Sequence, residues 1–276
     1  MSGPNKLKQL LARGEIAFGG VSHLPSTAIV ELMASAGYDF DIIDTEHGTY
    51  DVDSAGELIR AAHGAGITPI VRVLQNDPGL IMKALDLGAH GVIVPHIVSK
   101  EGAQRAVDAA RYAPEGHRGS CPYIAAAEFS LFDWGEYQDW ANRETMLFVL
   151  IEDKEGVQNI DEILSVKGID AVFLGPFDMS VGMGLRGNTM HPEVQASLAK
   201  VLTACRTRNL PVMHALLYPT DIDKWIESGV RMFAHGSDTA VLAQGSATFL
   251  RSVQGFRINR ASTKPGTITD AESYRS

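Results

Sequence analysis

Eight short aliphatic runs, each followed by a longer segment of helical periodicity, constrain the fold of this chain more than any other feature. The runs suit strands and are IAFGGV (16–21), DFDIID (39–44), ITPIVRV (67–73), GVIVPH (91–96), MLFVLIE (146–152), DAVFLG (170–175), PVMHAL (211–216) and VRMFAHG (230–236). Helical periodicity follows near 26–36, 53–65, 77–87, 99–111, 155–165, 192–208, 220–228 and 238–252. Runs that are apolar on both faces suit a parallel sheet covered by helices. The pattern predicts a closed (β/α)₈ barrel, with an open doubly wound sheet as the alternative.

The predicted barrel is a single domain over residues 1–256, with one long insertion. Segment 112–145 exceeds a plain connection between strand and helix and carries two of the three tryptophans. We expect it to form a partly helical excursion over the top of the barrel. Residues 257–276 lose the periodicity and are expected to form a polar tail.

Composition excludes several classes of partner. The formal net charge is -9 and no dense basic run occurs, so a nucleic-acid partner is not expected. The two cysteines, Cys121 and Cys205, cannot form a disulfide framework, which fits a reducing compartment. The N-terminal stretch lacks the apolar core of a signal peptide and no apolar run is long enough to span a bilayer. We therefore expect a cytoplasmic protein without a membrane partner.

Ionisable side chains collect where the predicted strands end, which is the end of such a barrel that carries active sites. The stretch DFDIIDTEHG (39–48) runs from an apolar strand into Asp44, Glu46 and His47. Other strand ends carry further ionisable groups: Arg72, His96, Glu152, Asp178, His214, His235 and Asp238. The chain therefore predicts one polar rim.

A divalent metal site is the first prediction for this rim. Glu152 and Asp178 follow neighbouring strands, so their carboxylates can converge on one ion, and hard oxygen ligands suit Mg²⁺ or Mn²⁺, with Co²⁺ as an alternative. Each acid taken alone is better explained as a helix cap or as the partner of a lysine. Taken together they favour a metal.

Acid–base and electrostatic roles follow for the neighbouring residues. Arg72 supplies a fixed cation for a substrate carboxylate or an enolate oxygen, and an ion pair with Asp44 or Glu46 is its structural alternative. His47 is the group best able to move protons near neutral pH, and Asp44 or another acid can orient it. For His96, a buried structural histidine and a substrate contact remain equal alternatives.

Other catalytic motifs are missing from the sequence. GMGLRG (182–187) matches a dinucleotide-binding pattern in form, but the acid-bearing loop FDMSV precedes it, and the next helix is expected to begin near Pro192. No lysine ends a predicted strand where a Schiff base would form, which favours metal-assisted chemistry.

These residues make the chain resemble the HpcH/HpaI family of metal-dependent, class II aldolases, such as 4-hydroxy-2-oxoheptanedioate and 2-keto-3-deoxy-sugar acid aldolases, within the phosphoenolpyruvate/pyruvate barrel superfamily. The resemblance covers most of the chain. The matching segments are DTEHG (44–48), VR (71–72), LDLGAHGVIVPHI (85–97), GHRG (116–119), IEDKEGVQNIDEI (151–163), GPFDMSVGMG (175–184), GNTMHPEVQ (187–195) and SDTAVL (237–242).

The resemblance implies a role for each matching residue. Glu152 and Asp178 would hold the ion, which a 2-oxo acid such as pyruvate chelates, and Arg72 would bind the keto oxygen. His47 would serve in the acid–base step at the hydroxyl that becomes the aldehyde, directly or through a bound water. Asp86 would orient that histidine from a neighbouring subunit, while Asp44 lies closer in sequence. The family assembles as a hexamer of dimers that exchange the last barrel helix, here near 238–252.

The chain departs from the family pattern around the oxo acid. The resemblance places Leu150, Gly175, Pro176 and Phe177 there, but many members have glutamine where Leu150 stands and alanine where Phe177 stands. An aromatic residue is common near the end of strand one, where this chain has Val21. These differences predict a more apolar pocket and leave the identity of the 2-oxo acid open.

The residues and the resemblance together predict a divalent-metal aldolase that reversibly cleaves a 4-hydroxy-2-oxo acid into a 2-oxo acid and an aldehyde. One alternative keeps the barrel and metal but carries out another reaction through an enolate, such as decarboxylation, hydrolysis or cleavage of a CoA thioester. A non-catalytic assembly subunit is the second alternative. The retained set of Glu152, Asp178, Arg72 and His47 argues against it, because a site freed from catalysis has no physical need for converging unpaired carboxylates.

Overall fold

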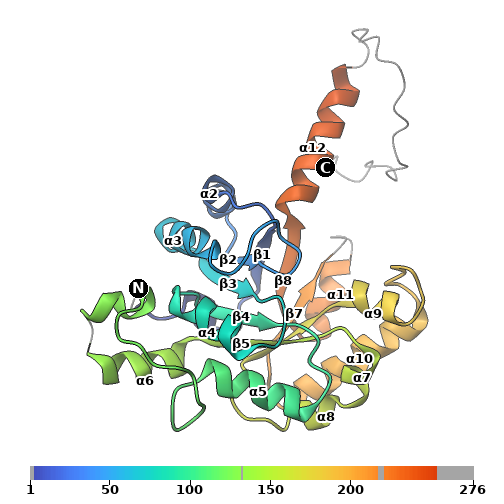
Figure 1. The fold of residues 1–276 in the computed structure, drawn as a ribbon. Coiled ribbons are helices and arrows are strands. Elements are labelled where there is room, and N and C mark those ends of the chain that lie inside the picture. Colours follow the sequence, from blue (N-terminus) through green and yellow to red (C-terminus); the bar gives the residue numbers. More distant parts are fainter. Residues whose placement is uncertain (1–2, 132, 217–220, 254–276) are drawn as a thin grey trace. The chain divides into compact units, whose positions relative to one another are not determined.

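Eight parallel strands close into a barrel in the order of the sequence, as the repeating pattern predicts (Figure 1). The computed structural model describes residues 3–131, 133–216 and 221–253. The strands are β1 (Ala17–Ser22), β2 (Phe40–Asp44), β3 (Thr68–Arg72), β4 (Gly91–Val94), β5 (Met146–Ile151), β6 (Ala171–Leu174), β7 (Val212–Ala215) and β8 (Val230–Ser237). Since β8 pairs with β1, the open doubly wound sheet is excluded.

Side chains on each strand alternate between two apolar layers. In β2, Phe40 and Ile42 belong to the cluster that fills the barrel, whereas Ile43 belongs to the cluster between the strands and the helices. In β5, Phe148 and Leu150 face the interior in the same way. The period of two explains why the strand sequences are apolar throughout.

Helices follow the strands over most of the predicted segments. They are α2 (Thr27–Ser35), α3 (Ala55–Ala65), α4 (Pro78–Asp86), α5 (Lys100–Ala110), α7 (Lys154–Gln158), α8 (Ile160–Ile163), α10 (Pro192–Arg206), α11 (Ile222–Glu227) and α12 (Asp238–Val253). Helix α10 begins at Pro192, as predicted, because proline needs no amide donor at a first helical position. The predicted segment 155–165 is divided between α7 and α8.

A short N-terminal helix, α1 (Lys6–Ala12), lies outside the eightfold pattern and was not predicted. The side chain of Asn5 caps it by accepting from the amides of Leu7 and Lys8. Leu7 is fully buried and belongs to the cluster inside the barrel. The helix therefore supplies part of the core.

The excursion 112–145 lies at the N-terminal ends of the strands, so the prediction that it covers the top of the barrel is wrong. It contains the 3₁₀ helix η1 (Ala125–Ser130) and α6 (Trp134–Glu144), which Figure 1 shows beside the N-terminus. Trp140 Nε1 donates to the carbonyl of Gly3 over 3.1 Å, and Asn5 Nδ2 donates to the carbonyl of Glu144 over 2.9 Å. Because α6 runs directly into β5, it must end where that strand begins.

The acid-bearing segment after β6 is helical, whereas the sequence predicted a loop. Helix α9 spans Pro176–Gly182, with Pro176 as its first residue and Asp178 in its first turn. Gly184 and Gly187 beyond the helix have positive φ angles of 76° and 84°, which fits the predicted bend ahead of α10.

The chain divides into two compact units, residues 1–240 and 241–276. In the second unit the structure describes the remainder of α12 to Val253. The predicted domain boundary at 256/257, the tail 257–276 and residues 217–220 lie outside the described residues. Within the described helices, none is long and apolar enough to cross a membrane.

Candidate active site

The rim of the barrel is built by continuing the inward-facing rows of three strands. Ile42, Ile70 and Leu150 belong to the interior cluster, and the residues two positions further along the chain are Asp44, Arg72 and Glu152, the last of which directly follows its strand. Because side chains alternate with a period of two, these ionisable groups also point toward the barrel axis, at its C-terminal end.

Asp44 is fully buried and its carboxylate accepts from five donors. Oδ1 accepts from the amides of Glu46 (3.0 Å) and His47 (3.3 Å) and from Arg72 Nε (2.9 Å). Oδ2 accepts from a terminal nitrogen of Arg72 (2.5 Å) and lies 2.9 Å from His23 Nε2, which donates because a carboxylate can only accept.

These partners decide the charge of Asp44. Burial alone would raise its pKa, but hydrogen bonds from His23 and Arg72 outweigh burial and hold the pKa well below its usual range. The negative charge of Asp44 is therefore compensated. The sequence offered an ion pair with Asp44 as the structural role of Arg72, and this ion pair is present.

Glu46 lies next to the same arginine but is much less compensated. Its Oε2 lies 3.3 Å from Arg72 Nε, yet this buried oxygen has no hydrogen bond. Burial raises the pKa of Glu46, although the positive charge of Arg72 acts in the opposite direction. The guanidinium of Arg72 forms its hydrogen bonds with Asp44. The negative charge of Glu46 is therefore only partly compensated by Arg72.

His47 extends from the rim, and its side chain is 59 % exposed. Its amide is bound by Asp44, whereas its ring nitrogen Nε2 lies 3.7 Å from Glu46 Oε2. Among the described residues, Asp44 therefore fixes the backbone of His47, and Glu46 is the acid close to its imidazole.

Glu152 follows β5 and is 4 % exposed. Its Oε1 accepts from the amide of His96 over 3.0 Å. Burial raises the pKa of Glu152 to about 7, and the charges of Glu46 and Asp178 add to this effect, against His96. Asp178 is exposed in the first turn of α9, and its charge acts on Glu152, the other predicted metal ligand.

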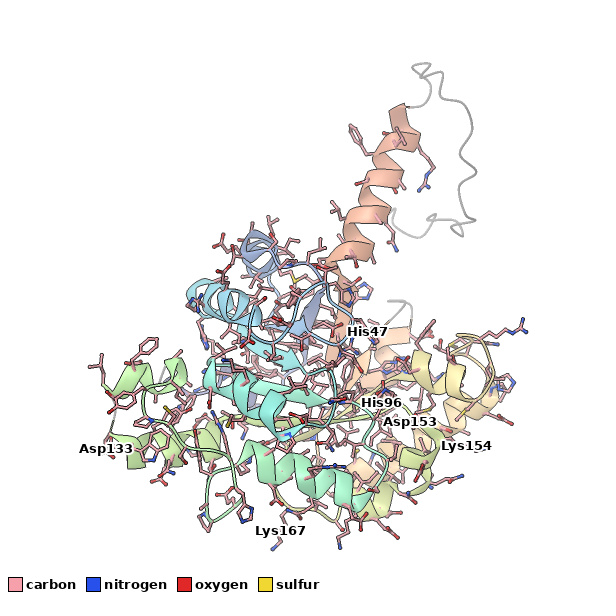
Figure 2. All side chains as sticks on the ribbon, in the orientation of Figure 1. His47, His96, Asp133, Asp153, Lys154 and Lys167 are labelled. Carbon is pink, nitrogen blue, oxygen red and sulfur yellow. The ribbon has the colours of Figure 1, made fainter. Side chains whose placement is uncertain are left out.

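A set of three residues offers closely spaced ligand atoms. One atom each from Glu46, His96 and Glu152 can be chosen so that all lie within 4.8 Å of one another. Of the predicted pair, Glu152 belongs to this set and Asp178 does not. His96 is half exposed, which makes the alternative of a buried structural histidine wrong. Figure 2 shows His47, His96 and Asp153 on the side of the barrel away from Asp133 of the excursion.

The residues predicted to surround the oxo acid differ in exposure. Leu150 is buried in the barrel interior, and Gly175 and Pro176 are buried where α9 begins. Phe177 is 51 % exposed. A Cβ added to Gly175 would lie only 2.7 Å from Glu152 Cβ, so this glycine allows the glutamate to pack against α9.

Asp86 lies at the opposite end of the barrel from the rim of the same chain. It is the last residue of α4, and its Oδ1 accepts from Arg118 over 2.6 Å. The arginine side chain is fully buried and lies over the ring of Tyr112. Within one chain Asp86 therefore does not join His47, and a role for it in catalysis requires a neighbouring subunit.

Sequence reasoning missed His23, which directly follows β1. Its ring joins Asp44 to the start of α12, because Nδ1 lies 3.2 Å from Thr239 Oγ1. Asp238 accepts from the amides of His23 and Leu24. The one available signal was an ionisable residue directly after a strand, the criterion that identified the other rim residues.

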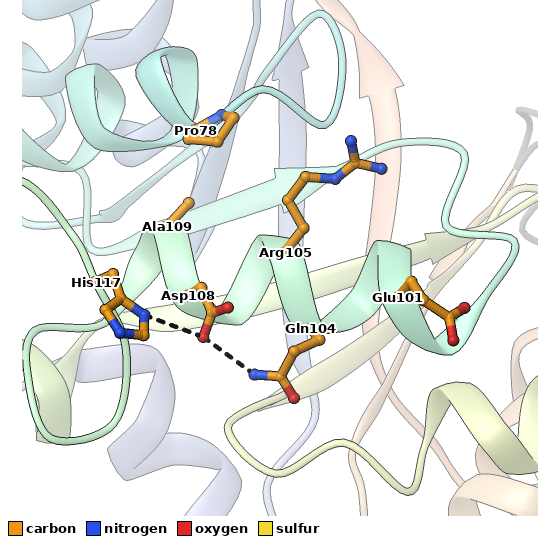
Figure 3. A pocket seen from close by; sticks show the side chains of 7 residues that line it. All are labelled: Pro78, Glu101, Gln104, Arg105, Asp108, Ala109 and His117. Carbon is orange, nitrogen blue, oxygen red and sulfur yellow. Dashed lines mark hydrogen bonds and ion pairs between the residues drawn. The ribbon is translucent and has the colours of Figure 1, made fainter.

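A hollow of about 410 Å³ on the outside of the barrel does not include the rim (Figure 3). It is lined along α5 by Glu101, Gln104 and Asp108, with His117 beside them. Asp108 accepts from Gln104 and lies 3.7 Å from His117 Nδ1. Within this hollow, Asp108 therefore already has two partners.

Comparisons with known proteins find relatives over most of the chain. The family model for HpcH/HpaI aldolase/citrate lyase matches residues 22–245. A 5-keto-4-deoxy-D-glucarate aldolase of Salmonella arizonae is 34 % identical over 245 residues, which cover 88 % of this chain and 94 % of that protein.

Two solved structures are similar over nearly their whole length. An HpcH/HpaI aldolase from Desulfitobacterium hafniense DCB-2 superimposes with a TM-score of 0.85 at 30 % identity, covering 95 % of this chain and 100 % of that one. The citrate synthase SbnG superimposes with a TM-score of 0.84 at 31 % identity, covering 91 % and 98 %.

Proposed function

The chain belongs to the HpcH/HpaI aldolase/citrate lyase family, and from this premise we propose that it is a divalent-metal-dependent aldolase. It reversibly cleaves a 4-hydroxy-2-oxo acid into pyruvate or a related 2-oxo acid and an aldehyde. The observation that carries the proposal is the concentration of acid at the rim, where Glu46 and Glu152 lie close together while the guanidinium of Arg72 is already paired with Asp44.

The donor set fits a divalent ion. Glu46 Oε2 is buried without a hydrogen bond, and burial of Glu152 beside Glu46 and Asp178 raises its pKa to about 7. Buried carboxylates are unfavourable unless they are paired or coordinate a metal. Glu152 and Asp178 would hold Mg²⁺, Mn²⁺ or Co²⁺, and when bound the ion supplies a Lewis acid for the 2-oxo group.

Arg72 stabilises the negative charge that develops when the carbon–carbon bond breaks. Two hydrogen bonds to Asp44 fix the guanidinium plane, so the cation needs no reorganisation during the reaction. The bond between C3 and C4 of the substrate breaks as the C4 hydroxyl loses its proton and becomes the aldehyde. The electron pair remains on the 2-oxo acid as an enolate, which then takes up a proton at C3.

His47 accepts the hydroxyl proton. Its exposed imidazole lies at the rim, its backbone is fixed by Asp44, and Glu46 is close enough to stabilise the imidazolium. Asp86 acts on His47 only from a neighbouring subunit, and Arg118 holds this acid in place. Glu46 of the same chain and Asp86 of a neighbouring subunit would then be the two carboxylate partners of His47.

The substrate is an acyclic oxo acid of the sugar-acid type. The relative from Salmonella arizonae is named for 5-keto-4-deoxy-D-glucarate, which makes that compound the first to test. Leu150 and Phe177 with Gly175 and Pro176 would form the wall beside the 2-oxo acid, and the apolar side chains favour a methyl or longer alkyl group over a second carboxylate there.

A dimer-based homo-oligomer, such as the hexamer that the family resemblance implies, is part of the proposal. Helix α12 carries four large apolar side chains that are each more than half exposed: Val241, Leu242, Phe249 and Leu250. Such a set supports burial against another subunit. A cytoplasmic location is supported by two free cysteines, one of them exposed.

Exchange of the methyl protons of pyruvate in D₂O, followed by NMR, tests the proposal. The enzyme is first treated with EDTA and then given Mg²⁺, Mn²⁺ or Co²⁺. We expect exchange only with an ion present, and loss of exchange in Glu152→Ala. Glu162→Ala, which removes an exposed glutamate on α8, is the matched control and should behave as the wild type.

A second enolate reaction is the competing function, because the citrate synthase SbnG shares the fold at 31 % identity. Aldehyde release from 5-keto-4-deoxy-D-glucarate separates the two. Ion-dependent exchange without cleavage of any hydroxy-oxo acid would favour a carbon–carbon bond-forming reaction with another acceptor. Absence of exchange with pyruvate and with longer 2-oxo acids would contradict the proposed chemistry.

A further inference from the structure

His23 lies between the rim and the first turn of α12, and both of its ring nitrogens have a partner. Nε2 lies 2.9 Å from Asp44 Oδ2, and Nδ1 lies 3.2 Å from Thr239 Oγ1. Asp44 Oδ2 is also the oxygen that accepts from a terminal nitrogen of Arg72. His23 and Arg72 therefore hold one carboxylate oxygen between them, and a change at the histidine reaches the arginine through that atom.

The partners of the ring decide which nitrogen carries the proton. An ionised carboxylate only accepts, so Nε2 of His23 donates to Asp44. In the neutral ring Nδ1 is then an acceptor, and the hydroxyl of Thr239 donates to it. Because that hydroxyl has a single hydrogen, Ser237 is the donor in its contact of 3.2 Å with Thr239 Oγ1. Ser237 Oγ accepts in turn from the amide of Ala240, in the first turn of α12, over 3.2 Å.

These hydrogen bonds all run in one direction, from the backbone of α12 to the carboxylate that holds Arg72. Each group accepts on one side and donates on the other, an arrangement in which neighbouring hydrogen bonds polarise and strengthen one another. The opposite tautomer of His23 would turn a lone pair toward the carboxylate of Asp44. Thr239 therefore fixes the tautomer that Asp44 needs.

The backbone around His23 is fixed from two further sides. The carboxylate of Asp238 accepts from the amides of His23 over 3.0 Å and of Leu24 over 2.9 Å. The carbonyl of His23 accepts from the amide of Thr49, in the turn after β2, over 2.9 Å. Since its backbone is held and both ring nitrogens are engaged, His23 can act on a substrate only through Asp44.

We propose that His23 is a positioning residue of the active site. Its donation to Asp44 fixes the carboxylate on which the guanidinium of Arg72 is oriented, and Thr239 keeps His23 in the donating tautomer. The inference rests on the proposed function, in which Arg72 stabilises the enolate, and preorganised charge of this kind acts on the transition state. The catalytic geometry of the rim then depends on the first turn of α12.

Three substitutions separate positioning from support of the fold. His23→Leu removes both ring nitrogens. His23→Gln keeps an N–H donor the same number of bonds from the backbone as Nε2. Thr239→Val removes only the hydroxyl and keeps the branched shape. Thr203→Val, which alters an exposed threonine on α10, is the matched control.

Exchange of pyruvate protons, measured with an ion present over a range of pyruvate concentrations, gives kcat and KM. We expect His23→Leu to lower kcat about 10- to 100-fold and to change KM by less than about threefold, because a misplaced charge acts on the transition state. His23→Gln should restore kcat to within about threefold of the wild type. Thr239→Val should lower kcat about threefold to 10-fold, and should add no further loss to His23→Leu, because both act along one path.

Chemical modification follows the position of Arg72 without relying on activity. Phenylglyoxal reacts with accessible guanidinium groups, and mass spectrometry of peptides gives the rate at each arginine. The side chain of Arg72 is 13 % exposed, so it should react slowly in the wild type. We expect a rate about threefold higher in His23→Leu and the wild-type rate in His23→Gln. The rate at Arg208, which is 31 % exposed, is the internal control and should not change.

A kcat in His23→Gln as low as in His23→Leu would overturn the proposal, as would a loss confined to KM. Equal reactivity of Arg72 in the wild type and His23→Leu would do the same. If His23→Leu does not fold, Thr239→Val decides the question, since it leaves His23 in place.

The same samples separate this inference from the proposed function. Exchange in every variant at the wild-type rate would leave the aldolase proposal standing and reject the role of His23. A wild type that exchanges no 2-oxo acid with any ion would contradict the aldolase, and the modification rates of Arg72 would still show whether His23 holds the arginine in place.

Discussion

Replacing Arg72 by alanine should damage both stability and catalysis, and the two effects can be separated. The arginine side chain is 13 % exposed and supplies two of the five donors to Asp44, which is fully buried. Removing one partner of a buried ion pair costs about 3–5 kcal/mol, because the other charge is left uncompensated. His23 and two amides still bind Asp44, so we expect the lower end, about 3 kcal/mol.

A second substitution, Asp44→Asn in the Arg72→Ala background, should restore about 2 kcal/mol of this loss, because no charge then remains to be compensated. Urea unfolding gives both values. Arg208→Ala is the control, since it removes an exposed pair with Asp161 at 3.1 Å and should cost less than about 1 kcal/mol.

The pH dependence gives an independent check. In the wild type the pKa of Asp44 lies below its unfolded value, so the pair stabilises the protein above about pH 4 and this contribution is lost as the pH falls through the folded pKa. Without Arg72, burial should raise the pKa of Asp44 above its unfolded value, so that Asp44 takes up a proton in the folded variant before it does so in the unfolded chain. The difference in stability between wild type and Arg72→Ala should therefore shrink as the pH is lowered from 7 to 4.

Activity should not recover with stability. Loss of one electrostatic donor commonly lowers kcat by about 10²–10³, and the double variant still lacks the cation. A double variant that regains pyruvate exchange would show that Arg72 serves only as the partner of Asp44. A double variant no more stable than Arg72→Ala would refute the reasoning about the uncompensated carboxylate.

Three further changes test other parts of the structure. Burial raises the pKa of Asp41 to about 7, against a hydrogen bond from Ser22, so stability should fall as the pH rises from about 4 to 7. Asp41→Asn should remove about 2–3 kcal/mol of that loss between pH 5 and pH 8 in urea unfolding, and an unchanged slope would contradict this. Gly175→Ala should weaken Mn²⁺ binding about 10-fold in calorimetry, since its Cβ would displace Glu152; unchanged affinity would argue against this close packing. Phe177→Ala should raise KM for the 2-oxo acid more than it lowers kcat, with stability changed by less than about 1 kcal/mol; a loss confined to kcat would exclude a binding role.

The strand pattern predicted the barrel because one local rule repeats eight times. Each strand is apolar on both faces, and the alternation that puts Ile42 inside the barrel also puts Asp44 at its rim. The position of the rim residues therefore followed from counting along the strands. The role of Pro192 at the start of α10 followed from its missing amide in the same way.

Features that depend on tertiary contact could not be read in this way. The seven residues of α1 are too few to show a clear period, and the position of the helix depends on the tertiary contact of Leu7 with the interior core. The position of α6 at the N-terminal ends of the strands depends on Trp140 meeting Gly3, far away in the sequence. Likewise, no spacing rule shows that His23 binds Asp44 across neighbouring strands.

The turn after β2 gives two acids, two residues apart, opposite electrostatic settings. Asp44 continues the inward row of the strand, is fully buried and receives the hydrogen bonds of Arg72, so its pKa falls. Glu46 lies beyond the strand end, where burial raises its pKa and the nearby Arg72, which does not hydrogen-bond to it, opposes the rise only in part. If Arg72 served stability alone, a single acid would neutralise it, and the two further buried carboxylates of Glu46 and Glu152 would only destabilise the fold. The proposed ion would supply the second cation that these two carboxylates need.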